Sequence, residues 1–256
     1  YDVTVIEKNK QPGGMLRSYM REGVHCNVGV HYMGALAEGQ VLRRCLDYMG
    51  IFEQLPLIRM GVNAPVDRYH FNGCHLDVGT FDLVDGFAAY AENLHAAFPT
   101  QKRQVRMLMD MLYRGARHLD RLDFLYTDRP ADFWIDQTDA LGSIFDELDC
   151  SPGLRAVFGM PSVFIGVPPA MCPQFFHAMT LASYLFSAWR LERHGTHLVD
   201  VCCRRLSALG GRLRTGQPVE HIRTRSGRVQ GVTLASGEQI DATTIIGAIH
   251  PKMVIS

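Results

Sequence analysis

One acidic side chain stands directly after a short apolar run near the start of the chain. Residues 3–6 are β-favouring, Glu7 follows them, and the proline and paired glycines beyond end the run. We therefore predict a buried strand with Glu7 at its carboxyl end. In a dinucleotide-binding βαβ unit, an acid at this place accepts hydrogen bonds from the hydroxyls of the adenosine ribose.

Two consecutive glycines, Gly13 and Gly14, come soon after this acid. A backbone without side chains can approach a ligand closely. Further glycines and the dipeptide His31-Tyr32 follow at short spacing. The whole segment is therefore predicted to lie against a nucleotide cofactor.

The glycine-rich turn that binds the pyrophosphate in such a unit, G-x-G-x-x-G, normally precedes the acid by about 20 residues. No such motif occurs in the 256 residues. We expect the first strand and its turn to lie before Tyr1, so that the chain is part of a longer protein.

The order of these residues resembles a known family. An acid, five residues, paired glycines and then G-x-x-x-x-x-G-x-H-Y is similar to the FAD-binding start of the phytoene desaturase, carotenoid isomerase and retinol saturase group. That group belongs to the amine-oxidase-like flavoproteins. The similarity continues through residues 33–50 and returns in residues 210–251, and it implies FAD as the cofactor.

The resemblance also implies which residues bind FAD: Glu7, Gly13, Gly14, Met15, Arg17, Ser18, His31 and Val219. Glu7 would hold the ribose and Val219 would contact the adenine. Arg17 and Ser18 would donate to the pyrophosphate or the flavin edge, although a simple surface turn is the alternative. His31 would lie beside the flavin or be a packed structural histidine. No catalytic residue is assigned, because the isoalloxazine itself carries the redox chemistry.

Two residues depart from the family pattern. Many relatives have arginine where this chain has Met15, which keeps a main-chain contact but removes a guanidinium. The family often has aspartate where this chain has Asn27, which can form hydrogen bonds but carries no charge.

The predicted fold class is α/β, an FAD-binding Rossmann-like domain of the glutathione-reductase type with a mainly helical substrate domain inserted. We place the two pieces of the FAD domain at residues 1–55 and 195–256, and the insert at residues 56–194. Periodicity and capping residues predict helices at 38–49, 81–98, 100–122, 136–148, from 152 onward, 175–191 and 196–209. A hairpin turn is predicted at Asn72-Gly73, a loop at 161–173, and strands near 213, at 219–224, at 229–234, near 240 and, buried, at 244–248.

The apolar stretch before residue 191 has two interpretations. Its aromatic and methionine side chains suit a long cavity for a polyene, but the same spacing is typical of a helix core. The candidates are Phe164, Ile165, Met171, Phe175, Phe176, Met179, Tyr184, Phe186 and Trp189. His177 would either face substrate or be a buried, hydrogen-bonded histidine. The helix is shorter than the roughly 20 residues that span a bilayer, although peripheral membrane contact is left open.

The amino-acid composition limits which kinds of binding partner are expected. With 26 basic and 26 acidic residues the formal charge is zero, which does not indicate a nucleic-acid partner. Seven cysteines without a C-x-x-C motif favour reduced thiols and a cytoplasmic location. His194 and His197 lack a third ligand, so we expect no metal site. Oligomeric state is left open.

Three functional hypotheses follow. The first is an FAD-dependent oxidoreductase that acts on carbon–carbon bonds of a lipophilic, carotenoid- or retinoid-like substrate by desaturation, saturation or isomerisation. The second is a non-catalytic lipid or prenyl carrier similar to the Rab GDP-dissociation inhibitors, which Met15 and Asn27 would permit. The third is a gene fragment without a stable fold, because a sheet without its first strand leaves an unpaired edge.

Overall fold

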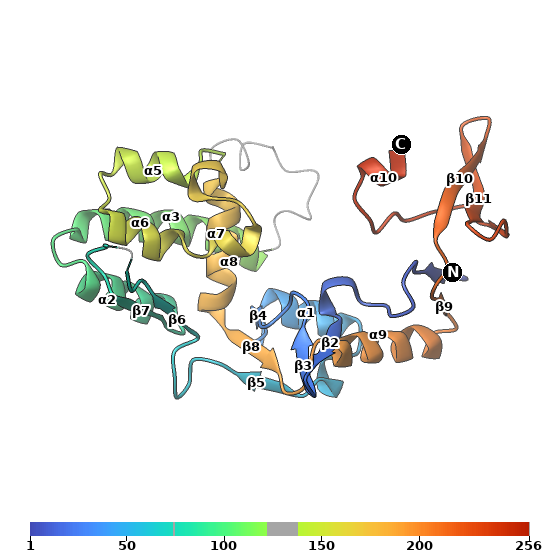
Figure 1. The fold of residues 1–256 in the computed structure, drawn as a ribbon, viewed down its shortest axis with the longest axis horizontal. Coiled ribbons are helices and arrows are strands. Elements are labelled where there is room, and N and C mark those ends of the chain that lie inside the picture. Colours follow the sequence, from blue (N-terminus) through green and yellow to red (C-terminus); the bar gives the residue numbers. More distant parts are fainter. Residues whose placement is uncertain (74, 122–137, 256) are drawn as a thin grey trace. The chain divides into compact units, whose positions relative to one another are not determined.

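The computed structural model describes residues 1–73, 75–121 and 138–255. Their contacts form two compact units (Figure 1). Unit 1 combines Tyr1–Val30 with Arg193–Ser256, and unit 2 is His31–Glu192. Both ends of the chain thus contribute to one unit, while the middle of the chain forms the other.

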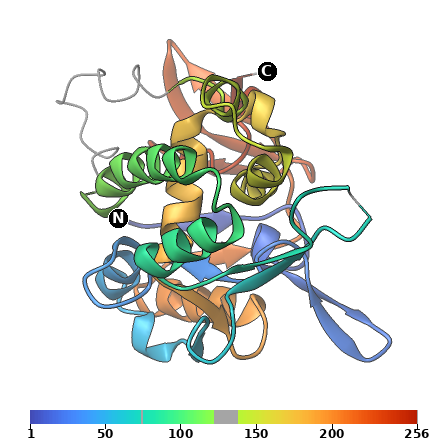
Figure 2. The same ribbon diagram turned by 90° about the vertical axis from the view of Figure 1, so that its left-hand side faces the viewer.

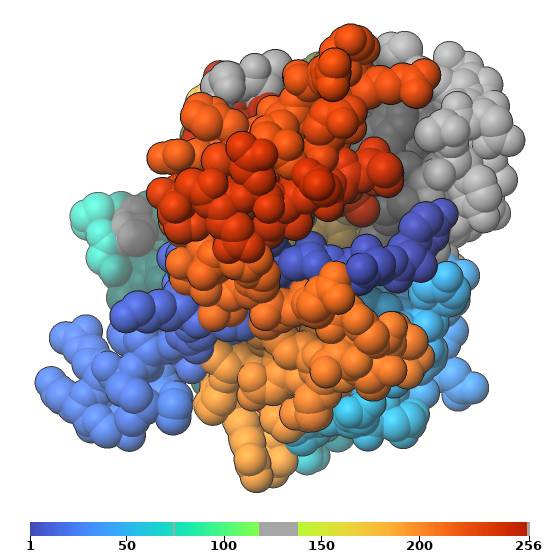
Figure 3. Space-filling model, turned by 90° about the vertical axis from the view of Figure 1, so that its right-hand side faces the viewer, coloured from blue at the N-terminus to red at the C-terminus, as the bar shows by residue number. Residues whose placement is uncertain are grey.

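Unit 1 consists of short strands and one long helix. Its elements are β1 (Thr4–Ile6), η1 (Gly14–Leu16), β2 (Ser18–Arg21), β3 (Val24–Asn27), α9 (Thr196–Ala208), β9 (Arg212–Arg214), β10 (Val219–Arg225), β11 (Arg228–Leu234), β12 (Gln239–Asp241) and α10 (Lys252–Ile255). β1 pairs in parallel with β9, β2 and β3 form a hairpin, and β10, β11 and β12 form an antiparallel sheet in that order. In Figure 3 the N-terminal segment, dark blue, runs alongside the orange and red chain of the same unit.

Unit 2 is mainly helical. Its elements are β4 (Met33–Gly34), α1 (Val41–Tyr48), η2 (Phe52–Gln54), β5 (Leu57–Arg59), β6 (Asp67–His70), β7 (Thr80–Leu83), α2 (Phe87–Ala97), α3 (Lys102–Arg121), α5 (Leu141–Glu147), α6 (Pro152–Gly159), α7 (Ser162–Ile165), η4 (Pro169–Met171), α8 (Gln174–Phe186) and β8 (Ala188–Leu191). The strands make a small sheet, β4-β8-β5, and a hairpin, β6-β7.

The core of unit 2 is centred on α8, which crosses α3 and packs against it (Figure 2). A helix that is apolar around most of its circumference is stable only when it is buried, and the buried residues of α8 include Phe175, Leu181 and Leu185. A Cβ atom on Gly115 of α3 would lie 2.6 Å from the Cβ of Ala178, so the glycine permits the close approach of the two helices. The apolar helix is therefore a core helix along much of its length.

Several local signals act as the sequence predicts. The Ser151 hydroxyl accepts a hydrogen bond from Leu154 N at 3.3 Å and Pro152 occupies the first turn, which starts α6 at the expected residue. The helices expected at 38–49, 100–122 and 196–209 correspond to α1, α3 and α9. The strands expected near 213, at 219–224 and at 229–234 correspond to β9, β10 and β11.

Other predicted elements were wrong. Residues 80–83 form strand β7, because Asp82 binds Arg68 across the hairpin at 2.6 and 2.8 Å instead of capping a helix. The loop at 161–173 contains α7 and η4, and the helix expected to reach residue 191 ends at Phe186. No described strand pairs with residues 244–248, so they form no strand, and Ile246 is 89% exposed. The first part of the helix expected at 136–148 lies partly outside the described residues.

Residues 31–55, which the sequence placed with the first piece of the FAD domain, make their contacts in unit 2. The hydroxyl of Ser187 accepts hydrogen bonds from Leu36 N at 3.0 Å and from Ala37 N at 3.1 Å, and it donates to Gln40 Oε1 at 2.5 Å. Ala35 N donates to Ser183 O at 2.8 Å. These bonds to the end of α8 tie the segment to the helical unit.

Candidate functional site

The carboxylate of Glu7 lies at the end of β1, as expected, and is held there by its neighbours. The strand is not buried as predicted, because Val5 is 41% exposed and Thr4 and Ile6 are only half-buried. Its Oε1 accepts hydrogen bonds from the backbone and the side-chain nitrogens of Asn9, both at 2.7 Å. Glu7 N donates to Arg214 O at 2.9 Å, and Glu7 O accepts from Gln217 N at 3.0 Å. Within the described part of the chain Oε2 has no partner, so one oxygen of an oriented carboxylate is free to accept hydrogen bonds from hydroxyl groups.

The loop that begins at Gly13 presents unpaired backbone donors. Gly13 has φ +113° and Gly14, the first residue of the short helix η1, has φ +53°. Among the described residues, the N–H groups of Gly13, Gly14 and Met15 donate to no acceptor. Consecutive free N–H groups at a left-handed turn favour an anion, which is the chemistry needed to bind a pyrophosphate.

Three close contacts hold this loop in place. A Cβ atom on Gly13 would lie 2.5 Å from Val199 Cγ2 of α9, so this glycine permits a helix contact. A Cβ atom on Gly29 would collide with the Met15 side chain, and one on Gly195 would collide with Leu16 O. Gly14, in contrast, has no atom within 4 Å of the place where its Cβ would be. The two paired glycines thus have different roles: Gly13 allows packing, and Gly14 leaves the surface open.

Arg17 and Ser18 continue the loop into the β2–β3 hairpin. Arg17 Nε donates to Gly14 O at 3.0 Å, which keeps the guanidinium beside the free N–H groups. Arg17 O accepts from Val28 N at 3.0 Å, and Ser18 begins β2 opposite Asn27. A positive charge at this place adds to the attraction for an anion.

Val219 belongs to unit 1, as Glu7 does, and its contact with the adenine stays a prediction. It is the first residue of β10. It comes two residues after Gln217, whose backbone N donates a hydrogen bond to Glu7 O. Its side chain is 43% exposed. The structure thus brings together Glu7 and the start of β10, and it separately brings together Gly13, Gly14, Met15, Arg17 and Ser18. His31 belongs to unit 2, so its place beside the flavin stays a prediction.

Sequence reasoning missed the residues that support this site. Asn9 orients Glu7, and the spacing E-x-N is a signal that would have found it. Val199 and Gly195 on the second piece of the unit offered no local signal, because only the fold brings them to the loop. Asn27 Oδ1 accepts from Gly195 N at 3.2 Å, so a neutral amide fixes the chain before α9 at the place where relatives often have aspartate.

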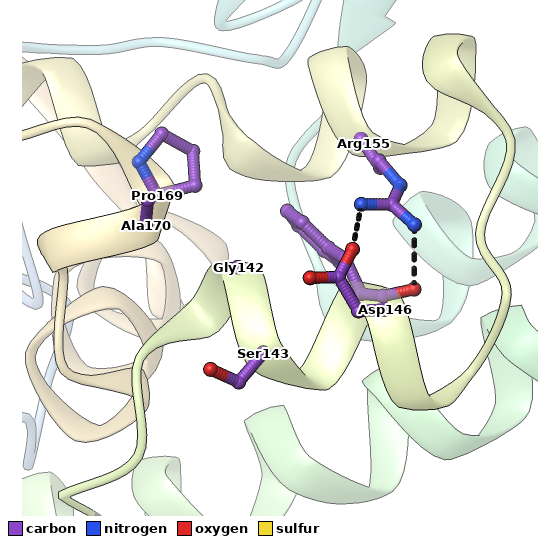
Figure 4. A pocket seen from close by; sticks show the side chains of 7 residues that line it. Gly142, Ser143, Asp146, Arg155, Pro169 and Ala170 are labelled. Carbon is purple, nitrogen blue, oxygen red and sulfur yellow. Dashed lines mark hydrogen bonds and ion pairs between the residues drawn. The ribbon is translucent and has the colours of Figure 1, made fainter.

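The hollow drawn in Figure 4 lies in unit 2 between α5, α6 and η4, and has a volume of about 360 Å³. It is lined by Gly142, Ser143, Phe145, Asp146, Arg155, Pro169 and Ala170. Arg155 forms an ion pair with Asp146, Nη2 donates to Phe145 O at 3.1 Å, and Nε donates to Cys150 O at 2.8 Å. The guanidinium is thus used to join α5 to α6 and offers no redox chemistry.

The predicted cavity residues fall into three groups by exposure. Phe175 is buried in the core, whereas Phe164, Met171 and Phe176 are exposed. The others are half-buried: Ile165, Met179, Tyr184, Phe186 and Trp189. His177 is fully buried and its Nε2 lies 2.7 Å from Phe158 O, as expected for a hydrogen-bonded histidine. Burial lowers the pKa of His177 to about 4, although the bond to Phe158 O opposes the shift.

Among the described residues there is neither a metal-binding cluster of His, Cys, Asp or Glu nor a helix long and apolar enough to cross a membrane.

Comparison with known proteins places this geometry in a family. The profile described as "Flavin containing amine oxidoreductase" matches residues 1–254. The all-trans-retinol 13,14-reductase of Rattus norvegicus is 23% identical over 93% of this chain and 41% of that protein. The all-trans-zeta-carotene desaturase of Myxococcus xanthus is 33% identical over 96% of this chain and 47% of that protein. The chain thus spans less than half the length of these relatives.

Solved structures share the fold. An oxidoreductase from Methanosarcina mazei matches with a TM-score of 0.62 at 16% sequence identity. The match covers 94% of this chain and 52% of the chain of that protein. A Rab GDI from Plasmodium falciparum matches with a TM-score of 0.50 at 9% sequence identity. The match covers 94% of this chain and 58% of the chain of that protein. At such identities the likeness shows the fold alone, and the predicted α/β fold class is confirmed. The carrier hypothesis gains no support beyond that shared fold.

Proposed function

Because the chain belongs to the family of flavin-containing amine oxidoreductases, we propose that the complete protein is an FAD-dependent oxidoreductase. Its substrate would be a lipophilic molecule of the carotenoid or retinoid kind, and it would add, remove or rearrange carbon–carbon double bonds. The relatives named for a retinol reductase and a carotene desaturase support this substrate class.

The observation that carries the proposal is the loop from Gly13 to Arg17. Its free N–H groups and the adjacent guanidinium suit the pyrophosphate of FAD. Glu7, which Asn9 orients, suits the hydroxyls of the adenosine ribose. The residues present therefore fit the cofactor that the family implies.

When it is bound, the flavin supplies the hydride chemistry. The residues of this chain bind and orient it: Glu7 holds the ribose, the main chain of Gly13, Gly14 and Met15 holds the phosphates, and the start of β10 at Val219 meets the adenine. Ser18 and His31 would complete the contacts, Ser18 toward the pyrophosphate or the flavin edge and His31 toward the flavin.

The first test is the visible absorption spectrum of the complete protein. We expect an oxidised flavin band that dithionite bleaches. Incubation with ζ-carotene or all-trans-retinol, followed by chromatography, then identifies the reaction. A folded protein that stays colourless after addition of FAD contradicts the proposal.

The role of Glu7 is tested by Glu7→Ala. The loss of bonds between a carboxylate and hydroxyl groups should weaken FAD binding by roughly tenfold to a hundredfold, because hydrogen bonds to charged groups contribute about 1.5–3 kcal/mol. The matched control is Asp200→Ala, which removes an exposed acid from α9 of the same unit. Equal FAD content in both variants contradicts the assignment of Glu7.

Peripheral membrane contact forms a further part of the proposal. Residues 156–189 contain no Asp, Glu, Lys or Arg, and Val163, Phe164, Met171 and Phe176 in this stretch expose apolar side chains. Such a surface favours shallow insertion into a lipid interface, from which a lipophilic substrate would be taken. Co-sedimentation with phosphatidylcholine vesicles should fall after Phe176→Ser, and unchanged binding contradicts this part.

A further inference from the structure

Three tyrosines and one aspartate meet in unit 2, and we refer to Tyr32, Asp67, Tyr69 and Tyr184 as the tyrosine cluster. The Tyr32 hydroxyl donates to Asp67 Oδ2 at 3.5 Å. The rings of Tyr32 and Tyr184 lie with their centroids 4.8 Å apart. Asp67 and Tyr69 are two residues apart in β6, so their side chains lie on the same face of the hairpin. The cluster thus places polar groups together in a mainly apolar unit.

The hydroxyl of Tyr69 is the unusual member. Tyr69 is 6% exposed, and its hydroxyl is buried without a hydrogen-bond partner among the described residues. Burial, followed by the nearby Tyr90, Asp67 and Tyr184, raises the pKa of Tyr69, so it stays a neutral donor and acceptor. A buried hydroxyl without a partner destabilises a fold, and in native proteins it calls for an explanation.

The carboxylate of Asp67 also retains capacity to accept. Its Oδ1 accepts from Arg68 N at 2.8 Å, and its Oδ2 accepts the long bond from Tyr32. The guanidinium of Arg68 is directed to Asp82 instead, at 2.6 and 2.8 Å. In the described part of the chain no cation forms an ion pair with Asp67, and an unpaired carboxylate is a strong acceptor for an alcohol O–H.

An apolar surface adjoins the cluster. The ring of Phe164 makes edge contacts with Tyr32 at 5.9 Å and with Tyr184 at 5.7 Å between centroids, and Phe164 is 46% exposed. Phe164 lies within the stretch of residues 156–189 that contains no charged Asp, Glu, Lys or Arg. A few polar groups beside exposed apolar side chains are typical of sites for molecules with a long apolar body and one polar end.

We propose that the tyrosine cluster binds the hydroxyl end of an amphiphilic isoprenoid alcohol, with the apolar chain lying against Phe164. The alcohol would donate to Asp67 and accept from Tyr69. Because the Tyr69 hydroxyl is buried, the side chains that cover it must shift to admit the ligand. This inference rests on the proposed function and narrows its substrate class from hydrocarbons and alcohols to alcohols.

The test compares two probes that differ only in one hydroxyl group, all-trans-retinol and its deoxy hydrocarbon analogue. Their binding to the complete flavin-loaded protein, presented in the same detergent micelles, is measured by quenching of tryptophan fluorescence. We expect the wild-type protein to bind the alcohol at least tenfold more tightly. Tyr69→Phe should lose roughly tenfold in affinity for the alcohol and nothing for the hydrocarbon, the usual size of one hydrogen bond.

The matched control is Tyr113→Phe, which removes the same atom from a tyrosine of α3 that is exposed and stacks on Phe87. It should leave both affinities unchanged. Asp67→Asn is the second variant should Tyr69→Phe fold poorly, and it should also weaken binding of the alcohol alone. Equal affinity of the wild-type protein for both probes, or a preference for the alcohol that survives both substitutions, overturns the inference.

The flavin absorbance of the same samples distinguishes failure of the tyrosine-cluster proposal from failure of the proposed function. A protein that carries a bleachable flavin but shows no preference for the alcohol refutes the tyrosine cluster as a hydroxyl site and leaves the proposed function intact. A protein that binds no flavin refutes the proposed function itself.

Discussion

The two units of this protein are built by different means. Unit 2 has a continuous core in which α3 and α8 pack with the neighbouring helices, with Leu108, Leu112 and Leu181 fully buried. Unit 1 buries few large apolar side chains, mainly on α9 and β11, and exposes Val3, Val5 and Ile246. Its candidate site depends on glycines that let main chain approach main chain or side chain.

The difference teaches where each unit is sensitive. A core of closely packed side chains loses stability when a side chain is shortened. A loop whose backbone packs closely through glycines loses its shape when a side chain is added. Substitutions in unit 2 should therefore act first on stability, and substitutions in the loop of unit 1 should act first on cofactor binding.

The largest effect is expected from Leu181→Ala in α8. This side chain is fully buried, so its loss should lower the free energy of unfolding by roughly 2–5 kcal/mol. Urea denaturation measures the change, and hydrogen exchange assigns it to a unit. Leu209→Ala, at an exposed residue that follows α9 in unit 1, should change stability by less than about 0.5 kcal/mol. Similar losses in both variants would remove the contrast between the units.

Acid should destabilise unit 2 through His177. The pKa of this histidine is about 4 in the folded protein, against about 6.5 when unfolded, because burial disfavours the charged ring. Between these values the unfolded state binds more protons, so stability falls as the pH falls from about 6.5 to 4, by up to roughly 3 kcal/mol.

His177→Gln should remove this part of the pH dependence, as measured by thermal unfolding across the window. His70→Gln, at an exposed histidine of β6, should leave the slope unchanged. An unchanged slope in His177→Gln shows that other groups cause the acid sensitivity.

Gly13→Ala tests the loop of unit 1 that begins at this glycine. The new Cβ would lie 2.5 Å from Val199 Cγ2 at a φ of +113°, a combination that should cost about 1–3 kcal/mol and reduce FAD content. Gly237→Ala is the matched control, because this glycine also has open space around it and a left-handed φ (+83°) that costs about 1–2 kcal/mol, but it lies outside the candidate site. Adding Val199→Ala to Gly13→Ala should restore part of the FAD content. Equal FAD loss in both single variants would refute the role of the contact between Gly13 and Val199 in shaping the loop.

The smallest effect is expected at Asn27. Asn27→Ala removes the acceptor for Gly195 N and should cost about 1 kcal/mol, whereas Asn27→Asp keeps an acceptor and should cost less. Thermal unfolding and FAD content measure both. Equal losses would mean that the amide group, not its oxygen, is what the site needs.

Local signals predicted much of the fold. The capping Ser151, the periodic helices and the turns before β11 and β12 all lie close to where the sequence places them. The family resemblance is confirmed by the profile match. Predictions failed where a distant partner overrides a local pattern: Asp82 pairs with Arg68 and stays in a strand, and Ser187 binds the main chain at Leu36 and ends α8.

The sequence by itself determined the α/β class and, through the family resemblance, the flavoprotein family, because glycines, an acid after a strand and apolar periodicity are local properties. That the segment from Glu7 to Ser18 approaches the cofactor stays a prediction. Only the tertiary structure decided what each residue does there. It packed Gly13 against Val199 of α9, left Gly14 open and assembled the tyrosine cluster from β6, α8 and the residue before β4. These outcomes depend on contacts between residues far apart in the chain, and no local pattern contains that information.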